Sequence, residues 1–187
     1  MSKPLLIVLI AKSGCGKSTI AHKLERKYNL KQVKSYTTRP MRDNAEDVNT
    51  HTFITMNEVE KYRDDMVAWN QYNSNFYFCT RNQLAESQIY VCDKQGLIQL
   101  FSNYTDKDII VYHIKCDSSI TAKRMSDRGD SDEQIRQRLE YDMAAFDGVE
   151  ELCDFSFTNE NQNQMNDIVE HIYMTYEGYV TRSKNDD

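Results

Sequence analysis

Residues 5 to 20, LLIVLIAKSGCGKSTI, decide how this chain folds. The first six residues, LLIVLI, are continuous, apolar and rich in branched side chains, which is typical of a parallel strand covered on both faces. The run is too short to cross a bilayer, which takes about 20 apolar residues in a helix. The glycines and the helix-like segment that follow predict a strand, a tight turn and a helix in direct succession.

The turn matches the phosphate-binding P-loop pattern G-x-x-x-x-G-K-[ST], except that Ala11 replaces the first glycine, which only begins the turn. Gly14 and Gly16 let backbone N–H groups face an anion at the positive end of the following helix. Lys17 brings a cation to the outer phosphates, and Ser18 offers a hydroxyl to Mg²⁺. The alternative, an ordinary turn with a solvated lysine, is disfavoured because strand and helix flank the motif. We therefore predict a nucleotide-phosphate site, with Ser18 as metal ligand, made by Ser13, Gly14, Cys15, Gly16, Lys17, Ser18 and Thr19.

Length, charge and cysteine content exclude several classes of protein. The 187 residues suit one domain with a good core. A net charge of −6 argues against a nucleic-acid-binding protein, which needs a surplus of Lys and Arg on one face. The five cysteines are scattered and never spaced as C-x-x-C, which fits reduced thiols without a disulfide or metal framework. Because no signal-peptide pattern is present, we expect a cytoplasmic protein.

Strand-like and helix-like segments alternate along the chain, which predicts an α/β fold with a parallel sheet flanked by helices. We expect a capping box of Asn57 and Glu60 to open a short helix. We expect Ile135, Leu139 and Met143 to form the buried stripe of a long helix. Residues 31–36 are expected in the main sheet, and residues 183–187 are expected to be disordered. The expected strands are 5–10, 66–72, 76–79, 88–92, 108–115 and 155–157, and the expected helices include 18–28, 57–64, 118–128 and 166–176.

The stretch SYTTRPMR at residues 35–42 resembles a motif of guanylate kinases in which two arginines hold the acceptor monophosphate. The resemblance covers nearly the whole chain and continues, in the family's order, at residues 51–53, 75–77, 93–96, 124–129, 138 and 157–159. It implies one domain with the P-loop NTPase fold: a core of about residues 1–34, 80–122 and 149–180, a small acceptor-binding insert of about 35–79 and a helical lid of about 123–148. It also implies ATP, Mg²⁺ and small-molecule nucleotides as ligands, no nucleic acid or membrane partner, and a monomer or homodimer.

Transfer of a phosphoryl group between two nucleotides needs cations around oxygens that repel one another. Arg39 and Arg42 are expected to close on the acceptor phosphate, although in isolation such a pair would be solvated loop arginines. A hinge at Gly129 would bring arginines over the donor phosphates; the alternative is a set of helix-terminus arginines paired with Asp127 and Asp130. The resemblance implies catalytic roles for Lys17, Arg124, Arg128 and Arg138, nucleotide contact by Asn159, and acceptor contacts by Ser35, Arg39, Arg42, His51, Asn70, Tyr77, Thr80 and Asp93.

Three departures from the family pattern fall in the acceptor half. Ala68 stands where a guanine-reading glutamate is usual, His51 where a tyrosine contacts the acceptor phosphate, and Phe78 where a glycine is usual. Asn70, on the same strand face as Ala68, offers an amide in partial compensation, and Thr80 adds a hydroxyl. A role of Asp93 on the acceptor, on Mg²⁺-bound water or only as a helix cap stays open.

The function implied is ATP-dependent phosphoryl transfer to a nucleoside monophosphate, with GMP or dGMP as the first expectation. A kinase of the same fold for another nucleotide or a sugar phosphate is the first alternative. A non-catalytic guanylate kinase-like binding module is disfavoured because the P-loop is not degenerate. A GTPase is disfavoured because no base-reading N-K-x-D motif follows the P-loop.

Overall fold

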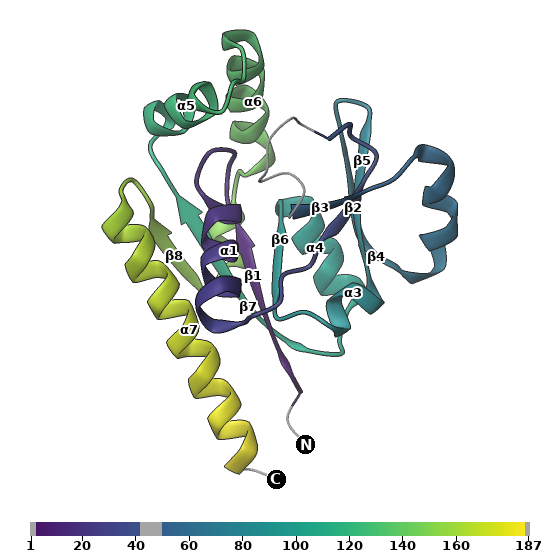
Figure 1. Cartoon of the computed structure of the whole chain (residues 1–187), viewed down its shortest axis with the longest axis vertical. Coiled ribbons are helices and arrows are strands. Elements are labelled where there is room, and N and C mark those ends of the chain that lie inside the picture. Colours follow the sequence, from purple (N-terminus) through teal and green to yellow (C-terminus); the bar gives the residue numbers. More distant parts are fainter. Residues whose placement is uncertain (1–2, 42–49, 186–187) are drawn as a thin grey trace.

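The computed structural model describes residues 3–41 and 50–185 (Figure 1). The apolar run that begins the chain forms β1 (Leu5–Ile10), and all six of its side chains are buried. β1 lies inside a parallel main sheet with the strand order β6-β1-β7-β8. The other strands are β6 (Ile89–Cys92), β7 (Asp108–Lys115) and β8 (Phe155–Thr158). The predicted α/β fold with a parallel sheet flanked by helices is confirmed.

Helices on both faces of the main sheet explain why β1 is apolar throughout. Alternate side chains of β1 belong to two buried clusters, one on each face. Helices α1 (Lys17–Tyr28) and α7 (Gln162–Asn185) pack on one face, and α3 (Arg81–Ala85) and α4 (Lys94–Asn103) pack on the other. A strand covered in this way has no solvated face on which a polar side chain could lie.

A second sheet, the insert sheet, has the order β3-β2-β5-β4 and stands beside the main sheet (Figure 1). β2 pairs in parallel with β3 and antiparallel with β5, and β5 forms an antiparallel hairpin with β4. Asn73 and Ser74 at the hairpin turn have positive φ angles of 46° and 61°, which suits a two-residue turn between twisted strands. The elements are β2 (Ser35–Thr37), β3 (His51–Phe53), β4 (Met66–Tyr72), β5 (Asn75–Thr80) and the 3₁₀ helix η1 (Met56–Asp65) between β3 and β4.

Helices α5 (Ser118–Asp127) and α6 (Asp132–Ala145) form a pair beyond the carboxyl ends of the main strands (Figure 1). Gly129, with φ of 96°, turns the chain between them. Ser131 then caps α6 in a capping box. The 3₁₀ helix η2 (Val149–Leu152) leads back to β8. The pair therefore stands at the sheet edge where open α/β sheets bind ligands.

Two expectations about the start of the insert are wrong. The capping box of η1 is made by Thr55 and Glu58, because this helix begins earlier than a box at Asn57 requires. The extended piece at residues 31–36 is divided between the sheets: Gln32 bridges to the main sheet, whereas Ser35 begins β2. The chain therefore leaves the main sheet inside a segment that the sequence pattern presents as one piece.

Two expectations about the later helices are also wrong. Met143 is 71% exposed and does not continue the buried stripe of α6. Two turns of a helix span about seven residues, so the residue on the same helix face as Ile135 two turns later is Asp142. The side chain of Asp142 is buried. Helix α7 continues to Asn185, so residues 183–185, which were expected to be disordered, are helical.

Candidate active site

A cavity of about 1160 Å³ opens at the carboxyl end of the main sheet, between the P-loop, the insert sheet and the helix pair α5 and α6. Ligand pockets usually measure about 300 to 1,000 Å³, so this one has room for more than one small molecule. The predicted site residues that line it are Ser13, Gly14, Gly16, Lys17, Ser18, Thr19, Ser35, Arg39, His51, Asn70, Tyr77, Asp93, Arg124, Arg128 and Arg138. Cys15, Thr80 and Asn159 do not line it, and Arg42 lies outside the described residues.

The P-loop requires glycine at two positions. Gly14 and Gly16 have φ angles of 75° and 92°, in the left-handed region that disfavours side chains. A Cβ at Gly14 would lie 2.9 Å from the carbonyl oxygen of Thr121, and a Cβ at Gly16 would lie 2.5 Å from Nδ2 of Asn159. The loop is therefore held closely from behind, and α1 begins directly after it at Lys17 with its N–H groups toward the cavity.

The ammonium group of Lys17 lies over the P-loop's own backbone. Its Nζ donates to the carbonyl oxygens of Ala11 and Lys12, at 2.5 and 3.1 Å. Burial lowers the pKa of Lys17 below its usual value, and the nearby guanidinium of Arg138 lowers it further. Ser18, the next residue of α1, lies on the cavity wall. The cation and the hydroxyl predicted from the motif thus lie next to each other at the start of the helix.

Two predicted nucleotide contacts support the P-loop from behind. Cys15 is buried, and burial raises the pKa of its thiol to about 11, so it is neutral at physiological pH. The buried side chain of Asn159 donates from Nδ2 to the carbonyl oxygen of Cys15 at 2.7 Å. Nδ2 of Asn159 is used in this contact, and neither Asn159 nor Cys15 lines the cavity. Direct nucleotide contact by these two residues therefore stays a prediction.

The arginines of α5 and of the turn after it are bonded within the protein. Arg124 donates from Nη1 to the carbonyl oxygens of Gly14 and Asn159, at 3.2 and 3.0 Å, and so holds the P-loop to the segment before α7. Arg128 makes an ion pair with Asp130, with Nε 2.9 Å from Oδ2. Asp130 is one of the two acidic partners that the sequence offered as the alternative to a phosphate contact. Both guanidinium groups nevertheless line the cavity.

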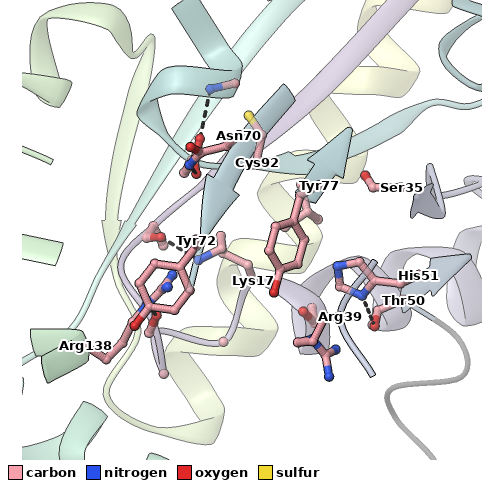
Figure 2. Close-up of a pocket in the computed structure, with 18 of the residues that line it drawn as sticks. Lys17, Ser35, Arg39, Thr50, His51, Asn70, Tyr72, Tyr77, Cys92 and Arg138 are labelled. Atoms are coloured by element: carbon pink, nitrogen blue, oxygen red, sulfur yellow. Dashed lines mark hydrogen bonds between the residues drawn. The ribbon is translucent and has the colours of Figure 1, made fainter. Parts of the chain in front are cut away.

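Arg138, on α6, reaches across to the P-loop. Its Nε donates to Oγ of Ser13 and lies 3.2 Å from Oδ1 of Asp142. Its guanidinium lies 4.2 Å from the ring centroid of Tyr72 and 5.3 Å from that of Tyr141. Figure 2 shows Arg138 beside Tyr72. A residue of the helix pair therefore contacts both the P-loop and the insert sheet.

Four predicted residues, which we call the acceptor cluster, line the insert side of the cavity: Ser35, Arg39, His51 and Tyr77. Nη1 of Arg39 donates to the carbonyl oxygen of Pro40 at 2.9 Å. Nδ1 of His51 is 2.8 Å from Oγ1 of Thr50, and its ring centroid is 6.0 Å from that of Tyr77. In Figure 2 this cluster lies on the other side of Lys17 from Arg138. Cationic and hydroxyl side chains thus face the P-loop across the cavity.

The floor of the insert side holds Ala68, Asn70 and Asp93. Asp93 caps α4 by accepting from the backbone N of Gly96 at 2.8 Å, and its other oxygen accepts from Nδ2 of Asn70. Asn70 Oδ1 accepts in turn from the backbone of Gln71. Both ends of the Asn70 amide are therefore bonded within the protein, and the partial compensation for Ala68 that was expected of it stays a prediction.

Thr80, which was expected to contact the acceptor, does not line the cavity. It is buried, and its hydroxyl accepts from the backbone N of Gln83 as the cap of α3. The spacing of Thr80 and Gln83 is that of a capping box, and a hydroxyl used in the cap faces the helix end rather than the cavity.

A guanylate kinase family model matches residues 3–177. The chain belongs to the guanylate kinase family. It is thus a nucleoside monophosphate kinase, and the P-loop and the arginines around the cavity are the parts expected of a phosphotransferase of this family. Within residues 3–41 and 50–185, no helix combines the length and apolar character that a membrane span needs.

Individual relatives of this guanylate kinase family member are distant. It is similar to the guanylate kinase of Agrobacterium fabrum, with 28% identity over 177 residues that cover 79% of this chain and 80% of that protein. The guanylate kinase of Brucella melitensis is 31% identical over 147 residues, which cover 73% of this chain and 67% of that protein. The crystal structure of guanylate kinase from Anaplasma phagocytophilum has a TM-score of 0.68 at 18% identity, covering 95% of this chain and 87% of that one. At that identity, the structural likeness shows the fold alone.

Sequence reasoning missed three residues of the site, namely Tyr72, Tyr141 and Asp142. All three lie against the guanidinium of Arg138, and the two tyrosines also line the cavity. A signal existed for Asp142, because it follows Arg138 by four residues on one helix face. No local pattern connects Tyr72 with α6, since the two meet only through the folding of the insert sheet.

Proposed function

We propose that this chain catalyses ATP-dependent, Mg²⁺-requiring transfer of a phosphoryl group to GMP or dGMP. The observation that carries the proposal is the single cavity that joins an intact P-loop to the acceptor cluster. A monophosphate held by Arg39 and Tyr77 would present an oxygen toward the terminal phosphate of a nucleotide held by the P-loop. The family membership and the names of the relatives support the same reaction.

The donor triphosphate would lie along the P-loop, whose N–H groups and helix dipole favour phosphate oxygens. Lys17 lies where the cavity and the loop meet, so its ammonium can turn from the carbonyl oxygens of Ala11 and Lys12 to a phosphate. Arg138 lines the same space from α6. These two cations would stabilise the negative charge that spreads over the transferred group.

The acceptor phosphate would be fixed by the acceptor cluster. A planar guanidinium such as that of Arg39 binds two phosphate oxygens at once, and the Tyr77 hydroxyl can donate to a third. Arg42 is expected to act with Arg39, as the family motif implies. Direct attack by the held oxygen needs no covalent enzyme intermediate, so the work of the protein is placement and charge stabilisation.

The residues present fit a magnesium ion held mainly by phosphates. The Ser18 hydroxyl belongs to a residue of the cavity wall at the start of α1. Among the described residues, no group of three or more His, Cys, Asp or Glu side chains forms a cage of its own. Mg²⁺ usually takes only one or two protein oxygens and completes its shell with phosphates and water. Bound there, it would neutralise charge on the donor phosphates.

The test is release of ADP from Mg-ATP with GMP, dGMP, AMP, CMP, UMP, dTMP and glucose 6-phosphate as acceptors. We expect the highest kcat/KM for GMP or dGMP, and no turnover after removal of Mg²⁺ by EDTA. A higher kcat/KM for a nucleotide with another base, or for the sugar phosphate, would mean that the protein is a kinase for that acceptor and not for GMP or dGMP. Binding of ATP without turnover of any acceptor would contradict the proposed function.

A further inference from the structure

Helix α6 turns a carboxylate toward the protein interior. Asp142 is 0% exposed, whereas aspartate is almost never fully buried unless it is paired. It occupies the inward position two turns after the buried Ile135, where an apolar side chain would complete the stripe. A buried charge is costly, so the groups that compensate it indicate what it does.

Asp142 contacts both the P-loop and Arg138. Its Oδ2 accepts from the backbone N of Ser13 at 2.6 Å, across 129 residues of chain. Its Oδ1 lies 3.2 Å from Nε of Arg138 and has no other polar partner in the described part of the chain. Nε of Arg138 also donates to the Ser13 hydroxyl. Ser13, Arg138 and Asp142 thus form a closed set of contacts between α6 and the P-loop.

The rest of the Arg138 guanidinium is held by ring faces and not by hydrogen bonds. Tyr72 of β4 and Tyr141 of α6 have ring centroids 4.2 and 5.3 Å from it, and the two rings contact each other edge to face at 4.9 Å. Its two terminal nitrogens donate no hydrogen bond to any described residue. The Nε edge is therefore anchored, while the terminal nitrogens keep their hydrogen-bonding capacity on the cavity wall.

We propose that Asp142 is a positioning residue, which fixes the Arg138 guanidinium so that its terminal nitrogens meet the transferred phosphoryl group. The inference rests on the proposed phosphoryl transfer but not on the identity of the acceptor. A long side chain that is oriented before the reaction loses less freedom in the transition state and needs less rearrangement of charge. The Asp142 carboxylate supplies that orientation at the Nε edge of the guanidinium, away from the two terminal nitrogens.

The test is a double-mutant cycle of Asp142→Asn and Arg138→Ala, with the best acceptor of the panel. The asparagine keeps an oxygen for the Ser13 N–H but removes the charge that faces Arg138. We expect Asp142→Asn to lower kcat about tenfold and to change the KM of ATP and acceptor by less than about threefold. In the Arg138→Ala background, the same change should alter kcat by less than about twofold, because there is no guanidinium left to position.

The matched control is Glu140→Gln on the same helix. Glu140 is an exposed carboxylate that pairs with Arg136 at 3.1 Å, so its loss should leave kcat within about twofold of wild type. An unchanged kcat in Asp142→Asn, an equal loss in both backgrounds, or tighter ATP binding with faster turnover would overturn the proposal. The last result would mean that the carboxylate competes with donor phosphate for the P-loop.

A second measurement covers the case in which Asp142→Asn does not fold. The Arg138→Ala variant leaves a carboxylate and two tyrosine rings around an empty guanidinium position. Added guanidinium ion at millimolar concentration should restore kcat of Arg138→Ala by about fivefold, whereas neutral urea should not. Absence of this rescue would overturn the proposal. Failure of the proposed function is separate, because it appears as a wild-type protein that turns over no acceptor.

Discussion

The two sides of the cavity are built from different parts of the chain. On the donor side, the P-loop presents backbone groups, with Gly14 and Gly16 at positive φ. On the acceptor side, the insert sheet presents side chains such as Arg39 and Tyr77. Backbone N–H groups are the same in every sequence that keeps the loop shape, whereas each side-chain exchange on the insert sheet removes or adds a contact. The donor side therefore tolerates Ala11, and the acceptor side is where relatives can differ in substrate.

The largest expected effect is on the donor side, where one side chain adds a charge that the backbone cannot. Lys17→Ala should lower kcat at least about a hundredfold, because it removes a cation aimed at the developing phosphoryl charge. Its thermal unfolding midpoint should not fall far below that of wild type, because a pKa lowered by burial means that the charge on this ammonium does not stabilise the folded state. The measurement is kcat with saturating Mg-ATP and acceptor.

Lys23→Ala is the control for Lys17→Ala. Lys23 lies on the same helix but contacts Asn166 of α7 at 3.3 Å, outside the cavity. The Lys23→Ala variant should keep the kcat of the wild type. Near-normal turnover in Lys17→Ala would remove the basis for placing donor phosphate at the P-loop.

The second largest effect should separate binding of the acceptor from binding of ATP. Arg39→Ala should raise the KM of the acceptor by about tenfold to a hundredfold, because a charge-assisted hydrogen bond is worth about 1.5 to 3 kcal/mol. The KM of ATP should stay within about twofold of wild type, since Arg39 faces the insert side of the cavity. The measurement is initial rates over a grid of both substrate concentrations.

Arg63→Ala is the matched change on the insert. Arg63 is an exposed arginine of η1 that pairs with Glu60 at 2.8 Å and does not line the main cavity. We expect its acceptor KM to be unchanged. An Arg39→Ala variant with the same acceptor KM as Arg63→Ala would show that Arg39 does not hold the acceptor. The assignment of acceptor binding to the insert side of the cavity would then lose this support.

The parts of the molecule that sequence predicts well are those in which neighbouring residues make the structure. The strand, turn and helix of the P-loop follow one another directly, and Thr80 and Ser131 each stand three residues before a glutamine, which is the local pattern of a capping box. These elements depend on local geometry and on burial patterns with a clear period. The same locality explains why the donor side could be predicted from its own short stretch of sequence.

Contacts between distant segments could not be predicted in the same way. The bond from Ser13 to Asp142 spans 129 residues, and Tyr72 reaches Arg138 only because the insert sheet folds toward α6. Periodicity arguments count apolar residues, so a buried carboxylate goes unseen and an exposed Met143 is placed inside. The bond from Asn70 to Asp93 could not be predicted for a related reason: a strand pattern gives the face of a side chain but not the group to which it bonds.

The smallest expected effect concerns the base of the acceptor, and it tests how far the acceptor side has changed. Ala68 lines the cavity at the position where the family motif carries a glutamate, and the nearby Asn70 is bonded to Asp93. With no carboxylate at Ala68, the wild-type protein should prefer GMP over AMP by less than about a thousandfold in kcat/KM. Ala68→Glu should increase that preference by about tenfold or more.

The physical reason lies in the edge of guanine, which presents a ring N–H and an amino group as neighbouring donors. A glutamate carboxylate accepts from both, whereas adenine offers a bare ring nitrogen that would repel it, so the same substitution favours one base and disfavours the other. Ala68→Gln is the matched control, because it has the same shape but only one accepting oxygen, and it should increase the preference less. Thermal unfolding of both variants separates misfolding from discrimination, since Ala68 is fully buried against the core. Equal responses to Glu and Gln, or a wild-type preference above about ten-thousandfold, would mean that Asp93 or another group already reads the guanine edge and that the acceptor side has kept its selectivity.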